Sequence, residues 1–137
     1  FNCSCTGGAA PDNITVTNDG NTNINVTVKT NVNASSFIGG TEPFGAEMWF
    51  ATRNASSNPG CHNTTGMTGI AGFDNATGLQ HIWRNFSTTD VDYLACANLT
   101  PTASANSFSL FIKLFIPADA PVATGANATL SFTASNW

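Results

Sequence analysis

Ten of the seventeen asparagines in this chain lie in Asn-x-Ser/Thr sequons, which restricts the folds open to it. The ten are Asn2, Asn13, Asn25, Asn33, Asn54, Asn63, Asn75, Asn85, Asn98 and Asn127. Ser and Thr make up 30 of the 137 residues, so chance placement would give roughly four sequons. Sequons accept N-linked glycans in secreted chains, and a glycan fits only on an outward face. Ten glycans would leave little bare surface for a cleft, so we do not expect an enzyme.

Alternation of apolar and polar residues predicts strands near both ends of the chain. The residues expected to point inward are Ile14 and Val16 in 13–17, Ile24, Val26 and Val28 in 23–29, and Ala128, Leu130, Phe132 and Ala134 in 127–134. The stretch 18–21, Asn-Asp-Gly-Asn, is a turn signal between the first two runs and predicts a hairpin. Asn13, Asn25 and Asn127 each fall on the polar phase of a run, so sequon position and strand parity agree.

Further strands are predicted at 47–53, 92–97 and 106–116, and the last is the strongest. Its core face holds Phe108, Leu110, Ile112, Leu114 and Ile116, while Phe111 and Phe115 stand on the other face beside Lys113. Residues 54–78 are rich in Gly, Ser, Thr and Asn, which indicates a long loop system. Residues 79–86 combine helical spacing of apolar residues with strand-like surroundings, and both a short helix and a strand stay open there.

About seven short strands in this length predict an all-β, antiparallel β-sandwich of the jelly-roll or immunoglobulin-like kind. We expect a single domain over 13–137, preceded by an N-terminal segment over 1–12.

Charged residues make up only 9% of the chain and the net charge is −4, against a usual ~25% charged residues. With only four Lys and Arg and no basic stripe, we expect no nucleic-acid partner. No 18-residue apolar run exists that could span a membrane. The chain begins at Phe1 without a signal-like segment, so we expect an extracellular, mature product whose export signal has been removed.

Cys3, Cys5, Cys61 and Cys96 form an even set in a sequon-rich chain, which favours two disulfides. A Cys3–Cys5 bridge is the least favoured, because residues i and i+2 sit at an awkward spacing for an unstrained bond. Two connectivities stay open, Cys3–Cys61 with Cys5–Cys96 or Cys3–Cys96 with Cys5–Cys61. A metal site using Cys3, Cys5, Cys61 and His62 is an alternative, but the paired spacing of usual metal ligands is missing.

A blue-copper site would need two His, a Cys and usually a Met. The chain contains His62, His81 and Met67 beside its cysteines, yet no His follows Cys96 in the way a cupredoxin requires. We therefore expect polar surface or loop histidines, with no metal and no cofactor.

The nearest carboxylate pairs are Glu42 with Glu47 and Asp90 with Asp92. A glycosidase would need such a pair across a cleft, but Asp90 and Asp92 follow Thr88 and Thr89 in what resembles a turn. We interpret these groups as solvated and expect no catalytic residue.

Four aromatic residues could form a sugar-binding platform: Trp49, Trp83, Tyr93 and Trp137. This keeps a second function open, a monomeric secreted carbohydrate-binding or adhesion module. Core packing explains Trp49 and Trp83 more simply, while Trp137 at the end of the sequence could dock into a neighbouring subunit.

The order of these elements resembles a known group of proteins. The opening ITVTNDGNTNINVTV and the close FSLFIKLFIPADAPVATGANATLSFTAS resemble the β-sandwich subunits of archaeal extracellular filaments, the bundling pili and threads of the TasA-like family. The resemblance implies copies assembled head-to-tail into a helical polymer by donor-strand complementation, for adhesion or biofilm formation. It implies Phe1–Ala10 as the donor, although the donor could extend through Val16. Phe1, Phe111, Phe115 and Trp137 are then the expected interface residues.

Overall fold

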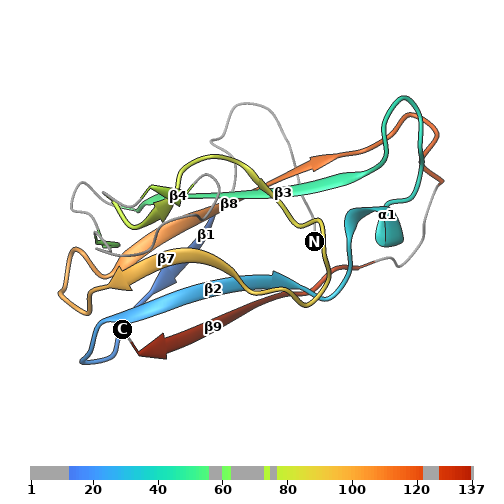
Figure 1. Ribbon diagram of the computed structural model, residues 1–137. Helices are drawn as coiled ribbons and strands as arrows, with labels where there is room; N and C mark the ends of the chain where they lie inside the picture. Colours follow the sequence, from blue (N-terminus) through green and yellow to red (C-terminus); the bar gives the residue numbers. More distant parts are fainter. Residues whose placement is uncertain (1–12, 56–59, 63–72, 75–76, 122–126, 137) are drawn as a thin grey trace.

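The computed structural model describes residues 13–55, 60–62, 73–74, 77–121 and 127–136, which form an antiparallel β-sandwich of two layers (Figure 1). The four-stranded sheet contains, in spatial order, β1 (Ile14–Thr17), β8 (Ser107–Phe115), β3 (Glu47–Asn54) and β6 (Arg84–Asn85). The five-stranded sheet contains β4 (Phe73–Asp74), β5 (Leu79–Gln80), β7 (Tyr93–Leu99), β2 (Ile24–Thr30) and β9 (Leu130–Asn136). The all-β sandwich predicted from the sequence is therefore confirmed, with three two-residue strands in addition to six longer ones.

The core lies between the two sheets, where the inward phases of their central strands meet. Phe50, Phe86 and Tyr93 form an aromatic cluster in which the ring centroids of Phe50 and Phe86 are 4.7 Å apart and those of Phe86 and Tyr93 are 5.6 Å apart. Leu99 and Phe108 are fully buried beside them. Each such side chain contributes roughly 1.5–3 kcal/mol through the removal of apolar surface from water.

The predicted hairpin between residues 13–17 and 23–29 is wrong, because β1 and β2 lie in different sheets. Asn18 explains the difference: its side chain is buried, and its Nδ2 donates to the carbonyls of Thr22 and Leu99, both at 2.9 Å. The backbone N–H of Gly20 donates to its Oδ1 at 3.0 Å. The turn thus carries the chain from one layer to the other.

The short helix that stayed open for residues 79–86 does not form. Leu79 and Gln80 make β5 and are fully buried, whereas Ile82 is 65% exposed, so the residues at helical spacing do not share a buried face. The helix among the described residues is α1 (Ala34–Phe37), capped by Asn33, whose Oδ1 accepts from the backbone N–H of Ser36 at 2.9 Å.

Both predicted disulfide connectivities are wrong, because Cys61 is bonded to Cys96 and the two are separated by 35 residues along the chain. The segment around Cys61 runs alongside β7: His62 donates its N–H to Ala97 O at 3.1 Å, and Thr100 donates to Gly60 O at 3.1 Å. This local pairing brings the two sulfur atoms together in the core. The other two cysteines, Cys3 and Cys5, lie outside the described residues.

Candidate assembly edge and glycosylation sites

One side of the sandwich ends in β1 and β9, the outermost described strands of their sheets. Because β3 lies against β5 and β7 while β8 lies against β7, the two sheet orders run in the same direction and place β1 and β9 on the same side (Figure 1). β1 pairs with β8 only from Ser107 to Leu110. On this side, the Phe111–Phe115 part of β8 has no neighbouring strand within the described part of the chain.

Burial fades along the core phase of β8 as the strand passes the end of β1. Phe108 and Leu110 are fully buried and Ile112 is half-buried, but Leu114 is 43% exposed and Ile116 is 62% exposed. The predicted phase is correct, yet its last two residues carry apolar surface that the described chain does not cover.

In the opposite sheet, β9 also carries inward-facing apolar residues that remain exposed. Phe132 lies opposite Val28 and Ala134 opposite Val26, and residues directly opposite each other point to the same face of a sheet. Val26 and Val28 are buried, whereas Phe132 is 37% exposed and Ala134 is exposed. We call Leu114, Ile116 and Phe132, together with the outer backbone edge of β9, which pairs with no described strand, the open edge.

The backbone of β9 is a ready template for a further strand. The sequence of Leu130–Asn136 contains no charged residue and no proline, the devices that usually protect edge strands from pairing. Seven consecutive residues pair with β2 in unbroken register, so the outer side of β9 is regular.

Seven of the ten sequon asparagines lie in the described chain. Asn13 and Asn127 are exposed, and Asn25, Asn33, Asn54, Asn85 and Asn98 are partly exposed. Asn54 differs from the others, because it continues the inward phase of β3 and its Oδ1 is buried without a hydrogen-bond partner. Asn2, Asn63 and Asn75 lie outside the described residues.

The outer face of the four-stranded sheet carries a cluster of aromatic residues around one cation. The Nζ of Lys113 lies 5.5 Å from the ring centroid of Trp49 and 5.3 Å from that of Trp83. Trp49 also donates its Nε1–H to Glu47 Oε2 at 3.0 Å, which fixes the indole. Core packing, expected for Trp49 and Trp83, is wrong, because both lie around Lys113 on this outer face. Tyr93, by contrast, is a core residue, so within the described residues the sugar platform is reduced to Trp49 and Trp83.

Two of the four predicted interface residues lie in the described chain. Phe111 and Phe115 are half-buried on the outer face of β8, opposite Ala51 and Glu47. Phe1 and Trp137 lie outside the described residues.

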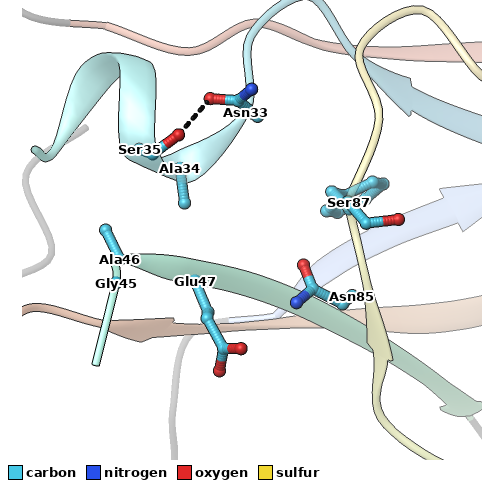
Figure 2. A pocket seen from close by; sticks show the side chains of 9 residues that line it. Asn33, Ala34, Ser35, Gly45, Ala46, Glu47, Asn85 and Ser87 are labelled. Carbon is cyan, nitrogen blue, oxygen red and sulfur yellow. Dashed lines mark hydrogen bonds between the residues drawn. The ribbon is translucent and has the colours of Figure 1, made fainter. Parts of the chain in front are cut away.

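A hollow of about 260 Å³ lies between α1 and β6, and two complete sequons line it (Figure 2). They are Asn33-Ala34-Ser35 and Asn85-Phe86-Ser87, with Gly45, Ala46 and Glu47 completing the lining. Figure 2 shows the Asn85 amide pointing into the hollow and the Glu47 carboxylate pointing away from it. Asn33 Oδ1 also accepts from the hydroxyls of Ser35 and Ser36, at 2.9 and 2.7 Å.

Three of the candidate metal-ligating residues, Cys61, Cys96 and His81, have structural partners in the described chain. Cys61 and Cys96 are bonded to each other and so cannot act as thiolate ligands in this form. His81 Nε2 lies 2.9 Å from Thr77 Oγ1 and 3.9 Å from Asp74 Oδ2 at the surface. In the part of the chain that the structure describes, no three His, Cys, Asp or Glu residues are grouped so that they could hold a metal ion.

Three of the four carboxylates considered as acid–base pairs each have a separate partner. Asp90 lies 3.8 Å from the Nζ of Lys29, and Asp92 accepts from the hydroxyl of Thr27 at 3.5 Å. Glu47 accepts from Trp49, as described above.

An unpredicted latch joins two loops at the end of the sandwich near α1. The Asp119 carboxylate accepts from the backbone N–H groups of Glu42 at 2.9 Å and Thr41 at 2.8 and 3.0 Å, and from the Thr41 hydroxyl at 3.2 Å. The N–H of Glu42, followed by that of Thr41, holds the pKa of Asp119 below its ordinary value. An aspartate 78 residues from its partner in sequence leaves no local signal that could have revealed this contact.

Comparisons with protein-family models, curated proteins and solved structures gave no match to this chain. Among the described residues, no helix is long and apolar enough to cross a membrane. The function must therefore be argued from the open edge, the outer faces and the sequons themselves.

Proposed function

We propose that this chain is the structural subunit of a secreted, N-glycosylated extracellular filament, in which copies join head-to-tail by donating a β-strand to the open edge. The observation that carries the proposal is the exposure of apolar residues on both sides of that edge: Leu114 on β8, Ile116 directly after β8, and Phe132 on β9. A sandwich that was complete in one chain would cover these positions with its own strands.

The physical gain from an added strand is twofold. Burying each large apolar side chain contributes up to roughly 1.5–3 kcal/mol, and the backbone N–H and C=O groups of an edge strand gain partners. Both gains are largest at an edge that lacks charge and proline, as β9 does. A head-to-tail contact that does not close on itself produces a helical polymer.

The resemblance to the archaeal filament subunits supplies the donor, the N-terminal segment Phe1–Ala10, which lies outside the described residues. The longer donor through Val16 fits less well, because Ile14–Thr17 already pair with β8 of the same chain. The outward-facing residues Phe111 and Phe115 are candidates for a second, lateral contact between subunits, and Trp137 for a terminal one.

The Cys61–Cys96 disulfide and the dense sequons support an oxidising, extracellular location. Sequons at exposed positions such as Asn13 and Asn127 would place glycans around the filament and replace the charged residues that usually keep a surface hydrated. Adhesion or biofilm formation is the role that the resemblance favours. The alternative is a monomeric carbohydrate-binding module that uses Trp49 and Trp83.

Negative-stain microscopy of the secreted protein tests the proposal. We expect filaments from the unaltered chain and folded, non-polymerising protein after Leu114→Asp or after deletion of Phe1–Ala10. Ile82→Asp is the matched control, because Ile82 is 65% exposed but lies away from the open edge, between β5 and β6. Single particles from the unaltered chain, or filaments that survive Leu114→Asp, would contradict assembly at this edge.

Denaturing gels with and without reductant add a separate readout. Because Cys61 and Cys96 are bonded to each other, a ladder that collapses on reduction would identify Cys3 or Cys5 as the residues that link subunits covalently. A single monomer band in both lanes would show that the polymer is held without such bridges.

A further inference from the structure

Asn85 occupies an unusual position among the sequons, because it is the only one in β6, the edge strand on the far side of the four-stranded sheet. It lies directly opposite Trp49 of β3, and Trp49 in turn lies opposite Lys113 of β8. Opposite side chains share a face and have their Cβ atoms about 4.5–5.5 Å apart. The register therefore places the Cβ atom of Asn85 beside that of Trp49, at the border between the hollow and the outer face.

A second indole approaches from the same strand segment. Trp83 precedes Asn85 by two residues, so extended backbone places both on one face. The contact of Lys113 with both rings confirms that Trp83 and Trp49 share this outer face. Trp83 is 38% exposed, and the Lys113 ammonium group lies over one face of each indole ring.

The backbone that carries Asn85 is held firmly. Its next residue, Phe86, is buried in the aromatic cluster and donates its N–H to Met48 O at 2.9 Å. The hollow between α1 and β6 leaves open space at the Asn85 amide. A hollow of this size is below the ~300–1,000 Å³ of drug-sized ligand pockets, which suits the start of a glycan rather than a separate ligand.

We propose that Asn85 carries an N-glycan whose first sugar packs against Trp83 and Trp49, so that this glycan is a structural part of the sandwich. The hollow gives the glycosyl bond room at the amide nitrogen, and the indoles give the apolar side of a pyranose ring a flat surface. The proposal rests on the glycosylation part of the proposed function and is independent of filament assembly. Because the sugar also stands at the side of β6 that pairs with no described strand, it covers that edge against unwanted pairing.

Two other described sequons differ from this arrangement. Asn127 is exposed in the segment before β9, and Asn33 uses its side-chain oxygen to cap α1. Asn127 therefore provides a matched control site, where a glycan is expected to add no specific contact.

The test is a double-mutant cycle on the full chain secreted from yeast, with glycopeptide mass spectrometry for occupancy and thermal melting for stability. Ser87→Ala removes the sequon and leaves Asn85 in place, and Trp83→Ala removes the indole. We expect each change to lower Tm by about 2–4 °C, the size of one aromatic contact in a domain of this length. The double variant should lose no more than the larger single loss, because both changes remove the same contact.

Two further variants separate this contact from general effects. Trp83→Phe should recover part of the loss in the glycosylated protein, and Thr129→Ala, which removes the Asn127 sequon, should be additive with Trp83→Ala. Additive losses for Ser87→Ala and Trp83→Ala, or an unmodified Asn85 beside occupied sequons elsewhere, would overturn the structural role while leaving glycosylation intact. A bare chain at every sequon would instead overturn the glycosylation that this proposal depends on, and would leave the microscopy of filaments as a separate question.

Discussion

β7 and β9 flank the same strand, β2, and each is seven residues long, yet their environments are opposite. In β7, five of the seven residues are buried, including Ala95 and Leu99 at 0% exposure. In β9, no residue is buried and the last five are exposed. Backbone pairing with β2 is available to both strands, so hydrogen bonding alone does not decide burial.

The difference comes from the opposite layer. β7 lies under β3 and β8, whereas β9 reaches beyond the side of the sandwich where β1 ends. Apolar and polar residues nevertheless alternate along β9 as in a half-buried strand, and Leu130, Phe132 and Ala134 lie on its inner face. β7 thus belongs to a core within one chain, and under the proposed assembly β9 would belong to a core that a second chain completes.

The largest expected effect concerns the disulfide that anchors β7. Replacing both Cys61 and Cys96 with Ser should lower the free energy of unfolding by about 4 kcal/mol in the chain-entropy model for a loop of this length. Denaturant titration of the monomeric variant measures it. A loss below about 1 kcal/mol would show that the buried bridge does not anchor β7 to the segment around Cys61.

A single core truncation in β7 should come next. Leu99→Ala removes a fully buried side chain and should cost about 3 kcal/mol through lost burial and a residual cavity. Leu114→Ala at the open edge is the control and should cost under about 1 kcal/mol in the same titration. Equal losses would erase the distinction between the closed core and the open edge.

In β9 we expect a substitution to weaken polymer assembly much more than it lowers the stability of the fold. Phe132→Ser should change the unfolding free energy by under about 1 kcal/mol, because the ring is already partly solvated. Sedimentation of the secreted protein should nevertheless show most of the polymer lost, since the ring then contributes nothing to the contact between chains. A large drop in stability with intact polymer would instead assign Phe132 to the core of its own chain.

The sequence could predict which residues of β2, β8 and β9 point inward, because alternation depends only on neighbouring residues. It could not predict that β1 pairs with β8 rather than β2, since the turn at Asn18 has hairpin chemistry but is held by a carbonyl 81 residues away. The same limit explains the wrong cysteine pairing and the missed Asp119 latch. In the sequence, Phe108–Ile116 shows the same apolar alternation as an ordinary core strand. Only the structure shows that no described strand covers its last residues.

The smallest expected effect lies at the Asp119 latch. Hydrogen bonds to the carboxylate lower its folded pKa, so its contribution to stability is present above the unfolded value of about 3.9 and is lost as the pH falls through the lowered folded value. Asp119→Asn should therefore lower Tm slightly at pH 7, and the difference from the unaltered chain should shrink steadily below about pH 4. A difference that stays constant down to about pH 2 would mean that the charge of Asp119 plays no part.

The unbroken register between β2 and β9 has a mechanical consequence. All seven residue pairs, from Ile24–Asn136 to Thr30–Leu130, lie side by side along the strand direction. When tension is applied along the strands, these hydrogen bonds are loaded together in shear, whereas tension across the strands would break them one after another. If subunits are linked end to end through this edge, pulling on the filament strains the many bonds of β9 at once, and tensile strength becomes a property of strand length.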